Sequence, residues 1–144
     1  MSATIDANLL LYASDAASPQ HSAALERLRG LARGPDLLYV FWPVLMAYLR
    51  VATHPSVFER PLDPPQARAN VGDLIDRPHV RCPGEQVGFW PVFEDTVGDE
   101  VVRGNLVTDA HIAALMRQHG VALIWTADRD FRRFEGITAR DPFA

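Results

Sequence analysis

The chain has 144 residues, of which 48% are hydrophobic, and a formal net charge of −4 at pH 7. This length and apolar content predict one globular domain over residues 1–144, with a sizeable core. No apolar run reaches the ~20 residues that span a bilayer, and no secretion signal starts the chain. The lone Cys82 excludes an internal disulfide. We therefore expect a cytoplasmic protein with no membrane partner.

The basic residues are of one kind. All 14 are arginine, and they are outnumbered by 18 acids. The absence of lysine excludes a P-loop, Schiff-base chemistry and a receiver-type aspartyl phosphate pocket. The acidic balance is also unlike that of a strong general nucleic-acid binder.

Apolar runs alternate with helical patterns along the chain. We predict strands at 3–6, 37–41, 80–82, 121–125 and 137–139. Between them we predict a helix that starts at Ser18-Pro19 and stops at Gly34-Pro35, and further helices at 42–53, from Asp63, at 86–102 and at 106–119. Pro91 is expected to kink or restart the helix at 86–102. This alternation predicts an α/β fold, with a mostly parallel sheet covered by helices on both faces.

Three aspartates occupy junctions in this pattern. Asp6 and Asp128 follow apolar runs, and Asp109 lies near the start of a helical stretch. The carboxyl ends of parallel strands line a ligand crevice, so these acids are expected to converge. Converging carboxylates repel one another unless a divalent cation is bound. The pattern therefore predicts a Mg²⁺ or Mn²⁺ site that acts on phosphate esters.

Asp6, Asp109 and the nearby Asp130 also have a purely structural alternative. Asp6 and Asp109 are suited to capping a helix, and Thr108 is suited to capping in place of Asp109. Asp130 is suited equally to metal ligation and to capping the turn through Phe131.

Four segments, in order, resemble the PIN-domain ribonucleases of the VapC toxin type. They are Ile5–Tyr12, Leu49–Phe58, Gly104–Leu115 and Thr126–Phe131. The resemblance implies a three-layer sandwich around a twisted five-stranded sheet, and a homodimer that requires Mg²⁺ or Mn²⁺. It further implies endonucleolytic cleavage of a structured RNA, such as tRNA or rRNA, and neutralisation by a cognate VapB-like antitoxin.

The resemblance also assigns roles to residues. Asp6, Asp109 and Asp128 are expected to be catalytic and, with Asp130, to bind metal. Asn8 and Thr126 are expected to hydrogen-bond the carboxylates, or else to serve ordinary turn chemistry. Arg50 and Arg129 are expected to bind substrate, although a solvated face explains Arg129 equally well.

One position departs from the family pattern. PIN domains usually place a glutamate two residues before the pair that is Leu49-Arg50 here, and this chain has Ala47. Either this branch of the family lacks that acid, or the residue was replaced to silence the enzyme.

Two rival functions follow from these residues. The first is a catalytically impaired PIN domain that acts only by binding RNA or an antitoxin, which Ala47 motivates. The second is a phosphatase with Asp6 as nucleophile. Against it, Asn8 stands where that chemistry usually has a second aspartate, and no lysine is available.

Overall fold

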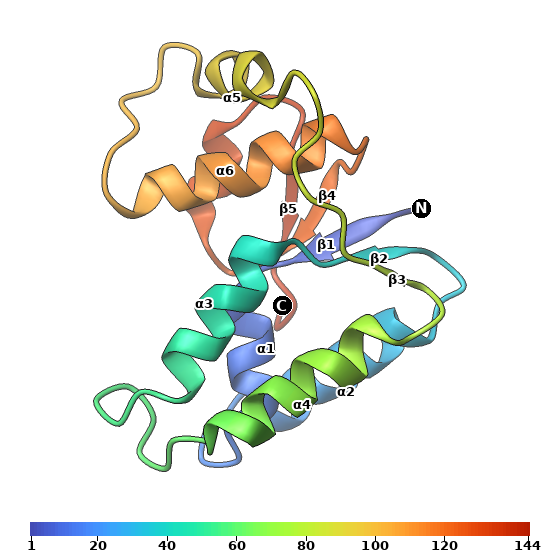
Figure 1. Ribbon diagram of the computed structural model, residues 1–144, viewed down its shortest axis with the longest axis vertical. Coiled ribbons are helices and arrows are strands. Elements are labelled where there is room, and N and C mark those ends of the chain that lie inside the picture. Colours follow the sequence, from blue (N-terminus) through green and yellow to red (C-terminus); the bar gives the residue numbers. More distant parts are fainter.

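The computed structural model describes residues 1–144, which form a five-stranded sheet in the order β3-β2-β1-β4-β5. The strands are β1 (Ala3–Ile5), β2 (Leu38–Tyr39), β3 (Val80–Arg81), β4 (Leu123–Trp125) and β5 (Thr138–Arg140). Every neighbouring pair of strands is parallel. The predicted α/β class and the five-stranded sheet are therefore confirmed (Figure 1).

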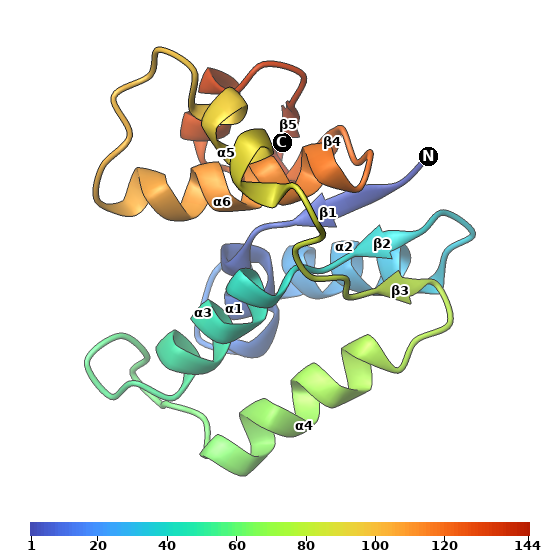
Figure 2. The same cartoon turned by 45° about the horizontal axis from the view of Figure 1, so that its top comes forward.

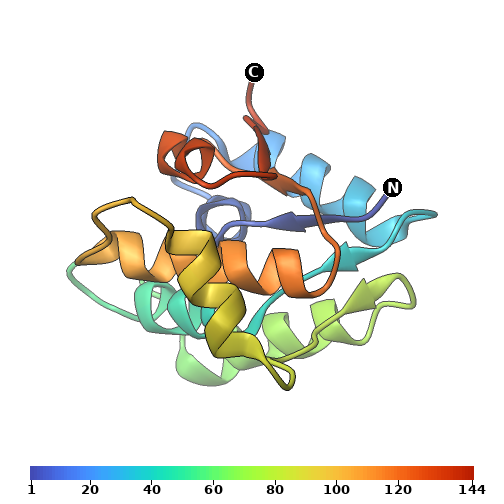
Figure 3. The same ribbon diagram turned by 90° about the horizontal axis from the view of Figure 1, so that it is seen from above.

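Helices cover both faces of the sheet. They are α1 (Ala7–Ser14), α2 (His21–Arg33), α3 (Trp42–Ala52), α4 (Pro64–Ile75), α5 (Phe89–Val97) and α6 (Asn105–Gln118), followed by the 3₁₀ helix η1 (Arg129–Arg133). Seen from above, α2 lies on one face, and α3, α4, α5 and α6 lie on the other (Figure 3). The tilted view shows α2 behind β2, and α4 below β2 and β3 (Figure 2). The predicted layering is thus present.

The central strand β1 carries the core. Its three residues are all buried, and Ile5 belongs to one cluster of 26 buried side chains that extends through the helices on both sides. Thr4 is the one polar residue of the strand, and its hydroxyl donates a 2.7 Å hydrogen bond to the carbonyl of Tyr39. A strand without an exposed face leaves little freedom in where Asp6, the next residue, is placed.

Two predicted helix boundaries were wrong. The helix expected from Ser18-Pro19 begins at His21, because Ser18 instead accepts a hydrogen bond from the backbone N–H of Gln20 in a preceding turn. The helix expected at 86–102 is only Phe89–Val97, since Gly88 and Gly98 flank it at φ 83° and φ 53°. Positive φ is open to glycine but breaks helical geometry.

Three further expectations can be compared with the structure. Pro91 falls in the first turn of α5, where its missing N–H is not needed, so it is not a kink. The three tryptophans were expected in the core or in a dimer interface; Trp42 and Trp90 are 41% and 64% exposed, whereas Trp125 is half-buried. None of the helices is both long and apolar enough to cross a membrane.

Candidate metal centre

The ends of β1 and β4 are adjacent and in register. Ile5 pairs with Trp125, and the backbone N–H of Asp6 donates to the carbonyl of Trp125 at 3.2 Å. Asp6 and Thr126, the residues that follow the two strands, therefore lie side by side. The Thr126 hydroxyl donates a 2.9 Å hydrogen bond to Oδ2 of Asp6 and accepts one of 3.0 Å from the backbone N–H of Asp128.

Asp6 does cap a helix. Its Oδ1 accepts a 2.7 Å hydrogen bond from the backbone N–H of Ala7, the first residue of α1. Burial raises the pKa of Asp6, the bonds from Thr126 and Ala7 lower it, and the nearby Asp128 raises it, with a net rise. A carboxylate has about four lone-pair sites, so these two bonds leave room for a further partner.

Asp128 and Asp130 lie at the start of η1. Oδ1 of Asp128 accepts a 2.9 Å hydrogen bond from the backbone N–H of Asp130, so Asp128 caps this turn. The alternative in which Asp130 caps the turn is therefore wrong. Instead, Oδ1 of Asp130 lies 3.4 Å from Nε of Arg133. This pair was not among the predictions, although a spacing of three residues between opposite charges indicates a contact within one helical turn.

Asp109 comes from α6, on its second turn. The helix begins at Asn105 after Gly104, which has no side-chain cap, so neither Asp109 nor Thr108 caps it as the structural alternative proposed. Burial, and after it the negative charges of Asp128, Asp6 and Asp130, together raise the pKa of Asp109 to about 7. This carboxyl is thus surrounded by negative charge.

Three of the four aspartates form a cluster that fits a hard divalent cation, and Asp6 lies beside it, joined to the backbone of Asp128 through Thr126. One carboxylate oxygen each from Asp109, Asp128 and Asp130 lies within 4.8 Å of the others. No basic side chain lies within ion-pair distance of Asp6, Asp109 or Asp128. Oxygen donors without nitrogen or sulfur suit Mg²⁺ and Mn²⁺. A cation would also relieve the repulsion that keeps the pKa of Asp109 high.

The other predicted site residues lie outside these contacts. Asn8 is exposed on the first turn of α1 and makes no side-chain hydrogen bond to the acids. Arg50 and Arg129 are exposed and have no carboxylate within ion-pair distance. Ala47 lies half-buried in the middle of α3, so α3 brings no acid at this position.

Comparison with known proteins defines the class. Residues 3–137 match the family model of the PIN domain. Ribonuclease VapC48 of Mycobacterium tuberculosis is 50% identical over 144 residues, which are 100% of this chain and 99% of that protein. Ribonuclease VapC37 of the same organism is 34% identical over 96% of this chain and 95% of its own length. The chain therefore belongs to the PIN-domain family and, within it, to the VapC-type ribonucleases.

Solved structures agree on the fold. The VapC20 toxin of Mycobacterium tuberculosis, described as cleaving the sarcin-ricin loop, aligns with a TM-score of 0.65 and 19% identity, over 94% of this chain and 98% of its own. VapBC2 of Rickettsia felis, solved with a DNA fragment from its promoter, aligns with a TM-score of 0.64 and 14% identity, over 97% of this chain and 98% of the other. At these identities the likeness concerns the fold alone.

Proposed function

We propose that this chain is a metal-dependent endoribonuclease toxin, with Asp6, Asp109 and Asp128 as its catalytic carboxylates and Asp130 as a further metal ligand. The observation that carries the proposal is the cluster of Asp109, Asp128 and Asp130 from α6 and the start of η1, with Asp6 beside it at the end of β1. A Mg²⁺ or Mn²⁺ ion held there supplies the Lewis-acid chemistry for hydrolysis of a phosphodiester, in which water adds at phosphorus and a P–O bond breaks.

The residues of the chain prepare this chemistry in separate ways. Thr126 fixes Oδ2 of Asp6 and the backbone of Asp128, which holds these two residues side by side. Asp109, whose pKa burial and neighbouring charges raise to about 7, would be held in its charged form by a bound cation. Binding is therefore expected to be weaker below pH 7.

We assign Arg129 and Arg50 to contacts with RNA phosphates. Both side chains are exposed and have no acidic partner, which leaves their guanidinium groups available. Arg129 follows directly after the proposed ligand Asp128. The proposed substrate is a structured cellular RNA, either tRNA or rRNA. The name and activity of the related ribonucleases support the substrate class but not the choice between these two.

The proposed partners are a cognate VapB-like antitoxin and a second copy of the chain. An arginine of the antitoxin would pair with the clustered carboxylates, which lack a basic neighbour apart from Arg133. Exposed apolar side chains support the homodimer, because Trp42 and Met46 lie four residues apart on α3 and are 41% and 50% exposed. A complex in which the antitoxin leaves the acids uncovered would contradict the first assignment.

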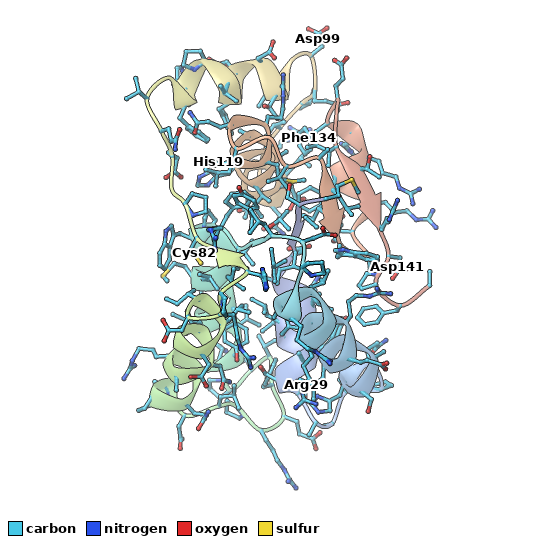
Figure 4. The ribbon with its side chains drawn as sticks, turned by 90° about the vertical axis from the view of Figure 1, so that its right-hand side faces the viewer. Arg29, Cys82, Asp99, His119, Phe134 and Asp141 are labelled. Atoms are coloured by element: carbon cyan, nitrogen blue, oxygen red, sulfur yellow. The ribbon has the colours of Figure 1, made fainter.

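The test is cleavage of total tRNA and rRNA with Mg²⁺ or Mn²⁺, and with chelator. The native chain is compared with Asp6→Asn and with Asp99→Asn. Asp99 is a suitable control because it is exposed, makes no ion pair and points away from the body of the protein (Figure 4). We expect chelator-sensitive cleavage by the native chain and by Asp99→Asn, and none by Asp6→Asn. Equal cleavage by all three would refute the assignment.

A catalytically impaired domain is the second candidate, and one observation favours it. With Ala47 on α3, the cluster has no carboxylate from that helix. If the native chain binds Mn²⁺ and an antitoxin but cleaves neither RNA class, the chain is a binding module. Cleavage by the native chain excludes it.

A further inference from the structure

Arg133 is the only basic side chain in contact with the clustered aspartates. Its Nε lies 3.4 Å from Oδ1 of Asp130, three residues earlier in η1. Its Nη1 lies 4.0 Å from Oε2 of Glu100, in the segment between α5 and α6. The guanidinium therefore links η1 to the segment that leads into the helix of Asp109.

The aspartates differ in how their side chains are held. Asp6 accepts two hydrogen bonds, and Asp128 accepts one from the backbone. The carboxylate of Asp130 accepts no backbone hydrogen bond, and its side chain is 49% exposed. Two other carboxylates lie within 4.8 Å of it, and like charges at this distance repel. Without Arg133, nothing opposes rotation of the Asp130 side chain into solvent.

We infer that Arg133 is a positioning residue that holds the Asp130 carboxylate beside Asp109 and Asp128, where it supplies the acid that α3 lacks at Ala47. The inference rests on the proposed metal-dependent function. It adds a residue that acts through Asp130 and does not itself contact metal or RNA. Phe131 and Phe134, both buried, anchor η1 so that the Asp130–Arg133 pair is presented on a fixed turn.

Two effects of Arg133 on metal binding have opposite signs. A guanidinium near a cation site repels the cation, so charge alone predicts that removal of Arg133 tightens binding. Positioning predicts that removal weakens binding, because Asp130 leaves the site. The direction of the change therefore separates the two effects.

The experiment measures Mn²⁺ affinity by electron paramagnetic resonance of the free ion. The proteins are the native chain, Arg133→Gln, Asp130→Asn, the double variant and Arg132→Gln. Arg132 is a matched control, since it is exposed on the same turn without an acidic partner. We expect Arg133→Gln to weaken binding about tenfold, and Arg132→Gln to leave it unchanged. In the double variant, binding is expected to be no weaker than in Asp130→Asn alone.

Thermal unfolding of each metal-free variant verifies that the fold is kept, as expected for a half-exposed side chain. Unchanged or tighter binding by Arg133→Gln overturns the inference, and so does an additive loss in the double variant. No Mn²⁺ binding by the native chain overturns the proposed function, and the inference with it. Native binding with an unaffected Arg133→Gln variant overturns the inference alone.

Discussion

The hydroxyl of Thr126 lies 2.9 Å from Oδ2 of Asp6, across 120 residues of sequence. The hydroxyl oxygen of Thr126 also accepts a 3.0 Å hydrogen bond from the backbone N–H of Asp128, and Thr126 is only 5% exposed. One buried side chain thus joins the ends of β1 and β4 and orients two of the clustered acids. The fold and the site depend on the same hydrogen bonds.

Substitution of Thr126 is therefore expected to affect stability and metal binding together. Thr126→Val keeps the shape but removes the hydroxyl that accepts from the N–H of Asp128 and donates to Oδ2 of Asp6, whose other oxygen keeps its bond from Ala7. We expect the free energy of unfolding to fall by about 1–3 kcal/mol and Mn²⁺ affinity to fall about tenfold. Thr126→Ser keeps the hydroxyl and should retain most of both. Urea unfolding measures the free energy of unfolding, and Mn²⁺ titration measures the affinity. Equal results for Thr126→Val and Thr126→Ser would contradict the prediction.

The raised pKa of Asp109 predicts how stability depends on pH. Its pKa rises from 3.8 to about 7 on folding, so between these values the folded state binds more protons than the unfolded state. Stability of the metal-free protein is therefore expected to fall as pH rises through this range. Because Asp109 is only half-buried, solvent screening limits the loss to about 1–2 kcal/mol.

Urea unfolding at a series of pH values tests this, in chelator. Asp109→Asn should remove most of the decline between pH 4 and 7 and be more stable than the native chain at pH 8. Asp73→Asn is the control, because Asp73 is an exposed helical aspartate on α4 without an acidic neighbour among the clustered residues. If the free energy of unfolding of Asp109→Asn still falls between pH 4 and 7, other groups cause the decline.

Much of this arrangement could be predicted from the sequence, for physical reasons. Apolar runs such as Val121–Trp125 indicate strands because parallel strands are apolar on both faces. The topology then brings the residues after β1 and β4 together, which explains why Asp6 and Asp128 converge as expected. Asp109 was expected to join them because a hard-ion site needs acids from distant segments, and its carboxylate lies within 4.8 Å of those of Asp128 and Asp130.

The other features of the fold and the site depend on interactions that the sequence pattern does not encode. Helix α5 ends at Gly98 because of a positive φ, while the run to Val102 still looks helical. The capping of η1 by Asp128 and not by Asp130 is a choice between two short acids with the same propensity. The contact of Arg133 with Glu100 joins segments separated by a whole helix, so only the fold reveals it.

The contact between Arg27 and Trp125 should contribute to stability without affecting the metal site. The guanidinium carbon of Arg27 on α2 lies 4.2 Å from the centre of the Trp125 ring on β4, a cation–π arrangement. We expect Arg27→Ala to lower the free energy of unfolding by about 0.5–1 kcal/mol. Mn²⁺ affinity should not change, because Arg27 contacts none of the clustered aspartates. Arg29→Ala, an exposed arginine of the same helix, is the control (Figure 4). Equal destabilisation by the two variants would contradict the prediction.

An acid at position 47 is expected to strengthen the site. Ala47 is half-buried in the middle of α3, at the position where the family pattern has glutamate. In Ala47→Glu, a further carboxylate joins the cluster, so Mn²⁺ affinity and chelator-sensitive RNA cleavage should each rise about tenfold. Ala23→Glu makes the same change at an exposed position of α2 and controls for net charge. If both variants bind and cleave alike, position 47 does not face the metal. If Ala47→Glu gains affinity but not turnover, the native cluster of four aspartates already holds the cation as catalysis requires.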